Sequence, residues 1–294
     1  MNVSIIYVNY NSSNLIINSI NSVIELTSDI SYEIIVVDNN SSSEEKNKLK
    51  NYCNPKNIKI IESDINLGFG KGNNLGTKYA KGEYLFFLNP DTYLINNAIN
   101  KLYNFAKEHN ILTCGANLFS ANLKPTLSYW MLMPSIIDEL SAFFCNIPLK
   151  IKHRNSHEHN LTTTPKEVAF ITGADLMIHN ELFNKLNGFD EDFFMYFEET
   201  DLQYRIKQLG HKIYNLPSAQ IVHLESQTLS SQTKKLKLFF TSRKKFYIKN
   251  HSKTQFKIAN TILKTSSLIR ICVFYILQKK EKINYWKTIL TQCS

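Results

Sequence analysis

The sequence predicts an α/β fold in which helices flank a mostly parallel, doubly wound sheet. Short apolar runs alternate with segments of helical periodicity four times in about the first 110 residues. Several of these runs end in a polar turn, which is typical of strands in such folds. Residues 234–294 differ, because they are strongly basic. We expect an α/β domain over residues 1–233, with halves 1–115 and 116–233, and a basic helical extension over residues 234–294.

The first strand–helix unit opens the chain. The run Val3–Val8 is mainly apolar, and the polar turn Asn9–Ser12 ends it. Apolar side chains then recur at helical spacing between Leu15 and Ile24. Strand, turn and helix in this order are the start of a βαβ unit.

The second strand, Glu33–Val37, ends in Asp38. A lone carboxylate at the carboxyl end of an early strand can accept hydrogen bonds from ribose hydroxyls or from the N–H of a pyrimidine ring. Alternatively, Asp38 belongs to the N-cap region of a polar helix that opens at Ser42 or Ser43. The two roles are compatible.

The third strand, Ile58–Ile61, precedes a glycine-rich loop, Asn66–Asn74, and a helix expected over Leu75–Ala80. Glycines just before a helix let backbone N–H groups approach a ligand, and the helix N-terminus favours phosphate. The loop matches neither the GxGxxG nor the GxxxxGK[ST] pattern. These mismatches argue against a Rossmann dehydrogenase and a P-loop NTPase.

The fourth strand, Tyr84–Leu88, is fully apolar, as a strand buried on both faces of a parallel sheet should be. Pro90 ends it, because proline cannot donate a ladder hydrogen bond. Asp91 therefore lies at the carboxyl edge, where open α/β sheets bind ligands. Beside Asn89, its carboxylate can hold a hard divalent cation, which can hold a diphosphate; the alternative is a solvated aspartate in a turn. A further helix spans Ile99–Ala106.

The stretch from Asn117 to Lys166 differs in composition from the preceding residues. It contains an apolar segment, Trp130–Pro134, and a polar, basic segment, Lys150–His159. The second segment has three histidines, but no neighbouring group orients them toward a metal, so we expect a mobile loop. We interpret the whole stretch as a variable insert over a substrate site.

We expect a strand and turn over Val168–Asp175 and a short helix over Asn180–Leu186. A longer helix is expected to begin at Asp201, because Thr200 and Gln203 have capping-box spacing. Its buried face is expected to contain Leu202, Ile206 and Leu209, with Gly210 ending it.

Glu198 and Glu199 come just before this expected helix start, where the helix dipole favours ionised carboxylates. An ionised carboxylate in a cleft is what a general base for an alcohol nucleophile requires. The alternative is that the two acids only stabilise the helix end. Asp201 and Arg205 form an i,i+4 pair that we interpret as structural. Further on, the predicted strand Ala219–Leu224 carries His223, either as a metal-binding imidazole or as a core histidine.

The net charge of +9 has an uneven distribution. Residues 234–294 carry fifteen Lys or Arg against one acid, a net of +14, so residues 1–233 carry −5. Such an extension suits an anionic membrane surface, or alternatively nucleic acid or solvent. Its basic clusters are interleaved with Phe239, Phe240, Phe246 and Tyr247. The apolar run Leu268–Leu277 is far shorter than the roughly 20 residues of a spanning helix, so it lies on a membrane at most.

The five cysteines lie far apart without metal-finger spacing, which indicates reduced thiols. The N-terminal residues lack a basic region and a cleavage site, so we expect no signal peptide and a cytoplasmic protein.

Seven motifs together resemble the family-2 inverting glycosyltransferases of the GT-A fold, with its Rossmann-like sheet. Within that family they are similar to the rhamnosyltransferase-like enzymes of bacterial O-antigen, lipopolysaccharide and related surface-polysaccharide synthesis. The motifs are VNYN at 8–11, VVDNNS at 36–41, NLGFGKGNN at 66–74, LNPDT at 88–92, GAD at 173–175, GFDEDFFMYFEETDLQYR at 188–205 and His223.

The resemblance implies roles for individual residues. Asp38 would bind the nucleotide base, Asp91 and His223 would hold a divalent cation (Mg²⁺ or Mn²⁺), and Glu199 would be the base, with Glu198 as the second candidate. The donor-nucleotide site would contain Asn9, Tyr10, Asp38, Asn66, Gly70, Asn73, Asn89 and Asp91. The acceptor side would contain Trp130, Gly173 and Asp175.

Two motifs depart from the family pattern. The DxD metal motif is Asn89-Pro90-Asp91 here, so only one ligand of the motif is charged. The Glu-Asp catalytic pair is Glu198-Glu199 here, and the extra methylene moves the carboxylate by about 1 Å, a shift that affects catalytic rates.

The reaction that the resemblance implies is inverting transfer of a sugar from a deoxythymidine or uridine diphosphate donor to a lipid-linked saccharide. The basic extension would then hold the enzyme against the inner face of the cell membrane, with no role for nucleic acid and the oligomeric state left open. Two alternatives are a nucleotidyltransferase-type nucleotide-sugar enzyme and a non-enzymatic nucleic-acid-binding module that uses the extension. The first usually has a basic, glycine-rich N-terminal loop, and VNYNSS at 8–13 is not one.

Overall fold

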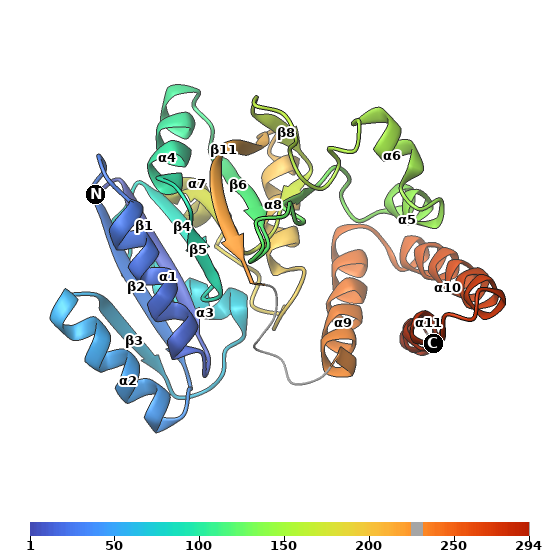
Figure 1. Ribbon diagram of the computed structural model, residues 1–294, viewed down its shortest axis with the longest axis horizontal. Helices are drawn as coiled ribbons and strands as arrows, with labels where there is room; N and C mark the ends of the chain where they lie inside the picture. Colours follow the sequence, from blue (N-terminus) through green and yellow to red (C-terminus); the bar gives the residue numbers. More distant parts are fainter. Residues whose placement is uncertain (225–231, 294) are drawn as a thin grey trace.

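A computed structural model describes residues 1–224 and 232–293. Figure 1 shows the sheet with its helices in one part of the molecule and a helical C-terminal extension at the other end. The first part of the chain forms, in order, β1 (Val3–Asn9), α1 (Ser13–Leu26), β2 (Tyr32–Asn39), α2 (Ser43–Cys53), the 3-10 helix η1 (Asn54–Lys56), β3 (Lys59–Ser63), α3 (Phe69–Thr77), β4 (Tyr84–Leu88), β5 (Thr92–Leu94), α4 (Ala98–Glu108) and β6 (Thr113–Phe119).

The remaining elements include the insert, the second half of the sheet and the extension. They are β7 (Tyr129–Trp130), α5 (Ile136–Phe143), α6 (Ile147–Lys152), β8 (Lys166–Val168), β9 (Phe170–Ile171), β10 (Asp175–His179), α7 (Asn180–Lys185), α8 (Glu198–Gln208), β11 (Ile213–His223), α9 (Gln232–Asn250), α10 (Lys253–Ile276) and α11 (Lys280–Gln292).

The main sheet has the strand order β3-β2-β1-β4-β10-β6-β11-β5, and β8 pairs with β11. Strands β1 to β4 are mutually parallel, whereas β10 is antiparallel to both β4 and β6. The predicted α/β class is therefore confirmed, and the antiparallel strand β10 marks where the second half of the sheet begins.

The four expected strand–helix units are confirmed, and β4 is buried on both faces. Tyr84, Phe86 and Leu88 face the apolar cluster under α1 and α4, whereas Leu85 and Phe87 face the cluster under α7 and α8. Helix α3 starts at Phe69 rather than near Leu75, directly after the left-handed Gly68 (φ +78°).

Two strands differ from the expectation. No strand is predicted over β6, where small side chains make room for a neighbour: a Cβ on Gly115 would lie 2.5 Å from Ile171 Cγ2. The expected strand and turn over Val168–Asp175 is divided more finely than predicted, because β8 ends at Val168 in the main sheet whereas β9 leaves that sheet to pair with β7. Asp175 instead opens β10.

Helix α8 begins at Glu198, three residues before the expected Asp201. The predicted capping box does not form, because the Gln203 side chain bonds both the N–H and the C=O of Ile171 at 2.8 Å. Leu202 and Ile206 are buried as expected, but Leu209 is 44% exposed.

The insert packs around buried polar groups, and Lys150–Lys152, expected to belong to a loop, instead end helix α6; the mobility of the segment stays a prediction. His157 and His159 are both buried, and His159 Nδ1 lies 3.1 Å from Ser128 Oγ. Ser156 accepts a hydrogen bond from the Tyr129 hydroxyl at 2.9 Å, which ties this segment to β7.

The extension consists of three helices that pack against the α/β domain. Phe246 and Tyr247 are fully buried in a cluster with Phe193 and Phe197, so these two aromatic residues are not available to lipid or to nucleic-acid bases. Arg243 pairs with Glu139 of α5 at 2.6 Å. The domain boundary near residue 233 remains a prediction.

Within residues 1–224 and 232–293, no helix has the length and apolar content that spanning a bilayer requires. The five cysteines are unpaired, as expected; three are buried, and Cys145 and Cys272 are exposed.

Candidate active site

Asp91 and His223 meet at the carboxyl edge of the sheet. Asp91 follows β4, and the next strand, β5, pairs antiparallel with β11 so that Thr92 is opposite His223. This register places His223 Nε2 3.3 Å from Asp91 Oδ1, and the Asp91 side chain is nearly buried. Two residues 132 positions apart in the sequence, which were both predicted metal ligands, are thus adjacent.

Glu198 and Glu199 lie in the first turn of α8, and their surroundings differ. Glu198 is buried, and its Oε2 has no hydrogen-bond partner in the described part of the chain. Glu199 is half-buried, and its Oε1 accepts a bond from the Thr200 hydroxyl at 3.4 Å. Burial raises the pKa of both carboxyls, and the Glu199 charge raises the pKa of Glu198 further. Glu199 is therefore the more accessible proton acceptor.

Two consecutive residues ahead of this turn have left-handed backbones. Tyr196 has φ +66° and Phe197 has φ +68°, conformations that cost bulky residues about 1–3 kcal/mol each. Phe197 is held by rings of the extension, with centroids 5.2 Å from Phe239 and 5.5 Å from Phe246. Packing of the extension thus supports the strained turn that presents the carboxylates.

Glycines bring the glycine-rich loop and the GAD motif close to the segment that contains Glu198 and Glu199. A Cβ on Gly70 would lie 3.2 Å from Glu198 Cβ, and a Cβ on Gly173 would lie 3.4 Å from Glu199 Cγ. At Gly68 a Cβ would overlap the Phe194 carbonyl oxygen, to which the Phe69 N–H donates a 3.0 Å bond. Close packing therefore requires glycine at position 68 and favours it at position 70, whereas a Cβ at Gly173 would make an ordinary van der Waals contact with Glu199.

A backbone contact links the Asp91 pair to Glu199. The N–H of Asn89, two residues before Asp91, donates to the Ala174 carbonyl at 3.0 Å. Ala174 follows Gly173, which packs against Glu199. The structure thus joins the candidate metal ligands and the candidate base through one short stretch of backbone.

The other predicted donor residues form a network at the ends of β1 and β2. Asp38 is buried, and its carboxylate accepts bonds from Asn9 Nδ2 and from the Ser41 N–H, both at 3.1 Å. Asn39 Nδ2 bonds Asn66 Oδ1 at 3.0 Å and so connects β2 to the glycine-rich loop. Tyr10 is 44% exposed. It borders a cavity of about 280 Å³ that is lined by Tyr10, Asn11, Ser12, Ser13, Asn14, Leu15 and Glu45.

The remaining predicted site residues have structural contacts. Asn73 is buried and donates to the Phe69 carbonyl within α3. Asp175 is fully buried and accepts from the Ala116 N–H at 2.5 Å and from Thr172; burial raises its pKa well above the usual range. Trp130 stacks on Phe170 with ring centroids 4.6 Å apart.

Sequence reasoning missed three contributors to this site: the Gln203 clamp on β9, the Phe194 carbonyl and the left-handed turn at Tyr196 and Phe197. The segment FFMYF at 193–197 contains no glycine or asparagine that would signal such a turn.

Asp91 and His223 form an incomplete ligand set for a cation. Within the described ranges, no group of three or more His, Cys, Asp and Glu side chains could hold a metal ion. Asp91 and His223 supply one oxygen and one nitrogen ligand at adjacent positions. This set fits a divalent cation that takes its other ligands from substrate phosphates and water.

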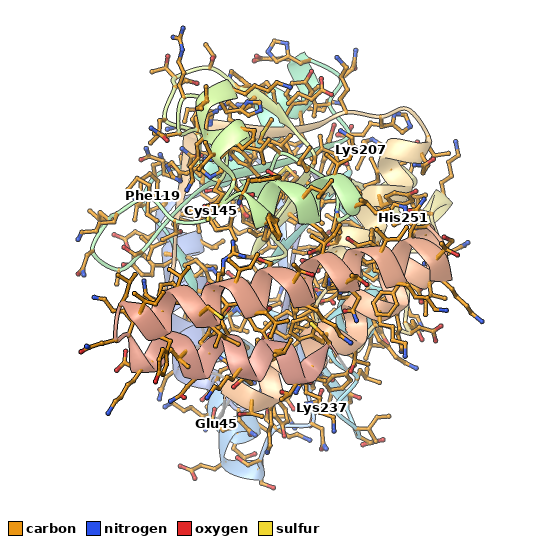
Figure 2. The ribbon with its side chains drawn as sticks, turned by 90° about the vertical axis from the view of Figure 1, so that its right-hand side faces the viewer. Glu45, Phe119, Cys145, Lys207, Lys237 and His251 are labelled. Carbon is orange, nitrogen blue, oxygen red and sulfur yellow. The ribbon has the colours of Figure 1, made fainter. Side chains whose placement is uncertain are left out.

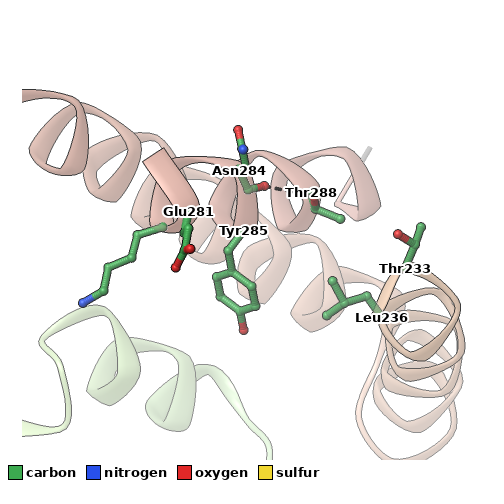
Figure 3. Close-up of a pocket in the computed structure, with 7 residues that line it drawn as sticks. Thr233, Leu236, Glu281, Asn284, Tyr285 and Thr288 are labelled. Atoms are coloured by element: carbon green, nitrogen blue, oxygen red, sulfur yellow. Dashed lines mark hydrogen bonds between the residues drawn. The ribbon is translucent and has the colours of Figure 1, made fainter. Parts of the chain in front are cut away.

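A larger cavity of about 530 Å³ lies between the start of α9 and α11. Figure 3 shows Tyr285 and Leu236 at its border, and none of the predicted site residues lines it.

The sequence and the fold match known proteins. Residues 4–186 match the model of the family described as glycosyl transferase family 2. The chain is 27% identical over 256 residues to the low-salt glycan biosynthesis hexosyltransferase Agl10 of Haloferax volcanii. The aligned region covers 84% of this chain and 75% of that protein. The chain is 26% identical over 207 residues to the rhamnosyltransferase WbbL of Escherichia coli, covering 65% and 72%.

Among solved structures, the fold resembles GalNAc-T7, which was crystallised with UDP, GalNAc and Mn²⁺. The TM-score is 0.62 at 17% identity, over 84% of this chain and 48% of that one. At this identity the likeness concerns the fold.

Proposed function

The chain belongs to glycosyltransferase family 2 and is a glycosyltransferase, and on that premise we propose that it transfers rhamnose or a similar hexose to a lipid-linked saccharide. The donor is a deoxythymidine or uridine diphosphate sugar, and the product enters bacterial O-antigen or related polysaccharide synthesis. The similarity to proteins named as a rhamnosyltransferase and as a hexosyltransferase of glycan biosynthesis supports this proposal.

The proposed reaction is a single displacement at the anomeric carbon. Glu199 accepts the proton of the acceptor hydroxyl, and the hydroxyl oxygen forms a bond to the anomeric carbon from the face opposite the nucleotide. The bond between that carbon and the diphosphate oxygen breaks, and the nucleoside diphosphate leaves with the bonding electrons. The configuration is therefore inverted.

One observation carries the assignment of Glu199: it is the half-buried carboxylate beside Gly173, and the next residue, Ala174, accepts the hydrogen bond from the Asn89 N–H. Glu198 is enclosed and has its pKa raised by both burial and Glu199, which favours its neutral form as a neighbour of the base.

Asp91 and His223 are proposed to hold Mg²⁺ or Mn²⁺ at the donor diphosphate. When bound, such a cation neutralises the negative charge that develops on the departing diphosphate. We further propose that the basic extension binds the anionic inner face of the cell membrane, where a lipid-linked acceptor would be found.

Calorimetric titration tests the proposal directly. The purified protein is titrated with a panel of nucleoside diphosphates and nucleotide sugars, first with Mg²⁺ or Mn²⁺ and then with EDTA. We expect one nucleotide to bind in a metal-dependent manner, which would also identify the sugar carrier. A folded sample that binds none of them would contradict the proposed donor site.

A further inference from the structure

Helices α5, α6, α10 and α11 form one end of the molecule (Figure 1), and apolar side chains are exposed there. On the insert, Ile137 of α5 is 69% exposed and Ile151 of α6 is 74% exposed. On the extension, Ile276 at the end of α10 is 78% exposed. We call the exposed apolar residues of these two segments the outer face; they include Ile137, Phe144, Ile147, Ile151, Tyr275 and Ile276.

The two halves of the outer face are joined. The Arg270 guanidinium of α10 donates to the Ala142 carbonyl of α5 at 2.7 Å and lies 3.6 Å from Cys145 Sγ. Figure 2 views this end of the molecule and shows α10 and α11 crossing it together, with the labelled Cys145 just above them. The insert and the extension therefore present one surface.

Exposed lysines accompany these apolar side chains. Lys150 and Lys152 belong to α6, Lys279 precedes α11, and Lys280 and Lys282 lie in the first turn of α11, where Glu281 is the only acid. Lysine is depleted at interfaces between proteins, whereas lysines beside exposed apolar and aromatic residues are typical of helices that lie in a membrane interface. The apolar side chains of the outer face and the lysines beside them together fit an anionic lipid surface.

We propose that the outer face is a single docking surface for an anionic lipid bilayer, to which the α5–α6 segment contributes as much as the extension does. Its apolar side chains enter the boundary between headgroups and acyl chains, while the lysines contact the headgroups. This goes beyond a basic extension that binds the membrane alone, because it assigns a membrane contact to the insert of the α/β domain.

The insert also connects this surface to the candidate active site. Helix α5 follows β7, which pairs with β9, and Ile171 of β9 is clamped by Gln203 of α8. This step rests on the proposed function, in which the acceptor is linked to a lipid. The bilayer that carries the acceptor would then lie against residues 116–233, the acceptor half of the enzyme.

Vesicle flotation tests the docking surface with the full chain. Phosphatidylcholine vesicles with and without phosphatidylglycerol are mixed with the wild type and with Ile151→Glu, Ile276→Glu and the control Ile24→Glu. Ile24 is an exposed helical isoleucine of α1, outside the outer face (43% exposed). We expect phosphatidylglycerol-dependent binding that Ile151→Glu and Ile276→Glu each weaken by about tenfold or more, and that Ile24→Glu leaves unchanged.

Three outcomes would overturn the proposal. If the wild-type protein does not bind anionic vesicles, the outer face is not a lipid-binding surface. Normal vesicle binding by Ile151→Glu, with a loss only in Ile276→Glu, would restrict the contact to the extension. A wild-type dimer that either variant converts to a monomer without vesicles would identify the outer face as an interface between two copies.

Nucleotide titration without vesicles separates this proposal from the proposed function. We expect both outer-face variants to bind the donor nucleotide as the wild type does. A wild type that binds vesicles but no nucleotide would contradict the donor site and leave the docking surface standing, whereas the reverse result would contradict the docking surface alone.

Discussion

Glu198 and Glu199 are adjacent in the chain, but Glu198 is buried whereas Glu199 is only half-buried. Replacing Glu199 by Gln removes the proposed proton acceptor while keeping size and shape, so we expect turnover to fall by about 10²–10⁴-fold. Donor affinity, measured by calorimetry, should stay unchanged. Glu198→Gln is the matched variant and should retain much more activity; equal losses in both variants would contradict the assignment of Glu199.

The pH dependence of turnover follows from the raised pKa of Glu199. A general base acts in its deprotonated form, so activity is lost as the pH falls through the pKa of Glu199. Because burial raises that pKa, the loss should occur at a higher pH than for an exposed glutamate, whose pKa is about 4.3. A profile of kcat/KM against pH measures it, and an acidic limb at or below the ordinary glutamate value would contradict the prediction.

Asp91 is expected to act through donor binding. Asp91→Ala should weaken metal-dependent nucleotide binding, because it leaves His223 as the single side-chain ligand of the pair. The binding measured in EDTA should change little. Unchanged binding in the presence of Mg²⁺ or Mn²⁺ would mean that the Asn89-Pro90-Asp91 turn is structural.

Single residues were predictable where a strand end determined their position. Asp91 was predicted just after a strand and His223 at the end of one, and the sheet brings the two side chains together. The different surroundings of Glu198 and Glu199 could not be predicted, because they depend on contacts from Gly70 and Gly173, which are distant in the sequence.

At the scale of elements, local signals located most strands and helices but not the start of α8. The capping-box pattern at Thr200 and Gln203 is a local signal, and a tertiary contact overrides it because Gln203 bonds Ile171 of β9. The strained residues Tyr196 and Phe197 are likewise held by distant rings of α9. Tertiary packing, which sequence patterns do not report, decides both features.

Helix α9 should contribute strongly to stability through Phe246. This ring is fully buried and lies 5.5 Å from Phe197 and 5.7 Å from Tyr204 between ring centroids. Phe246→Ala should lower the free energy of unfolding by about 3–5 kcal/mol. Ile248→Ala, on the same helix but 39% exposed, should cost far less. Thermal or denaturant unfolding measures both, and equal effects would contradict the packing described.

At the scale of the whole molecule, the charge difference between residues 1–233 and the extension predicts salt-sensitive membrane binding. Binding to vesicles that contain phosphatidylglycerol should weaken as NaCl rises from about 0.05 to 0.5 M, because screening shortens the reach of the lysine charges. Binding that is insensitive to salt would indicate that the apolar side chains alone determine the affinity.

The charge pattern predicts a basic extension beside an acidic α/β domain, but it does not predict how the two join. That junction centres on Asp201, which is fully buried and accepts bonds from three residues. Its partners are Arg205 Nε at 2.8 Å, Lys249 Nζ at 2.8 Å and Asn250 Nδ2 at 2.9 Å. The i,i+4 pair was predicted from spacing, whereas the two contacts from α9 required the fold.

The contacts of Asp201 with α9 also affect how the α/β domain would be oriented at a membrane. Asp201 follows Glu199, the proposed base, by two residues. Undocking the extension would remove the Lys249 and Asn250 partners of the Asp201 carboxylate, which is costly. A protein that meets a bilayer through the outer face would therefore do so as a rigid body. The distance between Glu199 and the headgroups would then be fixed. The enzyme would therefore select acceptors by the distance between their hydroxyl and the membrane surface.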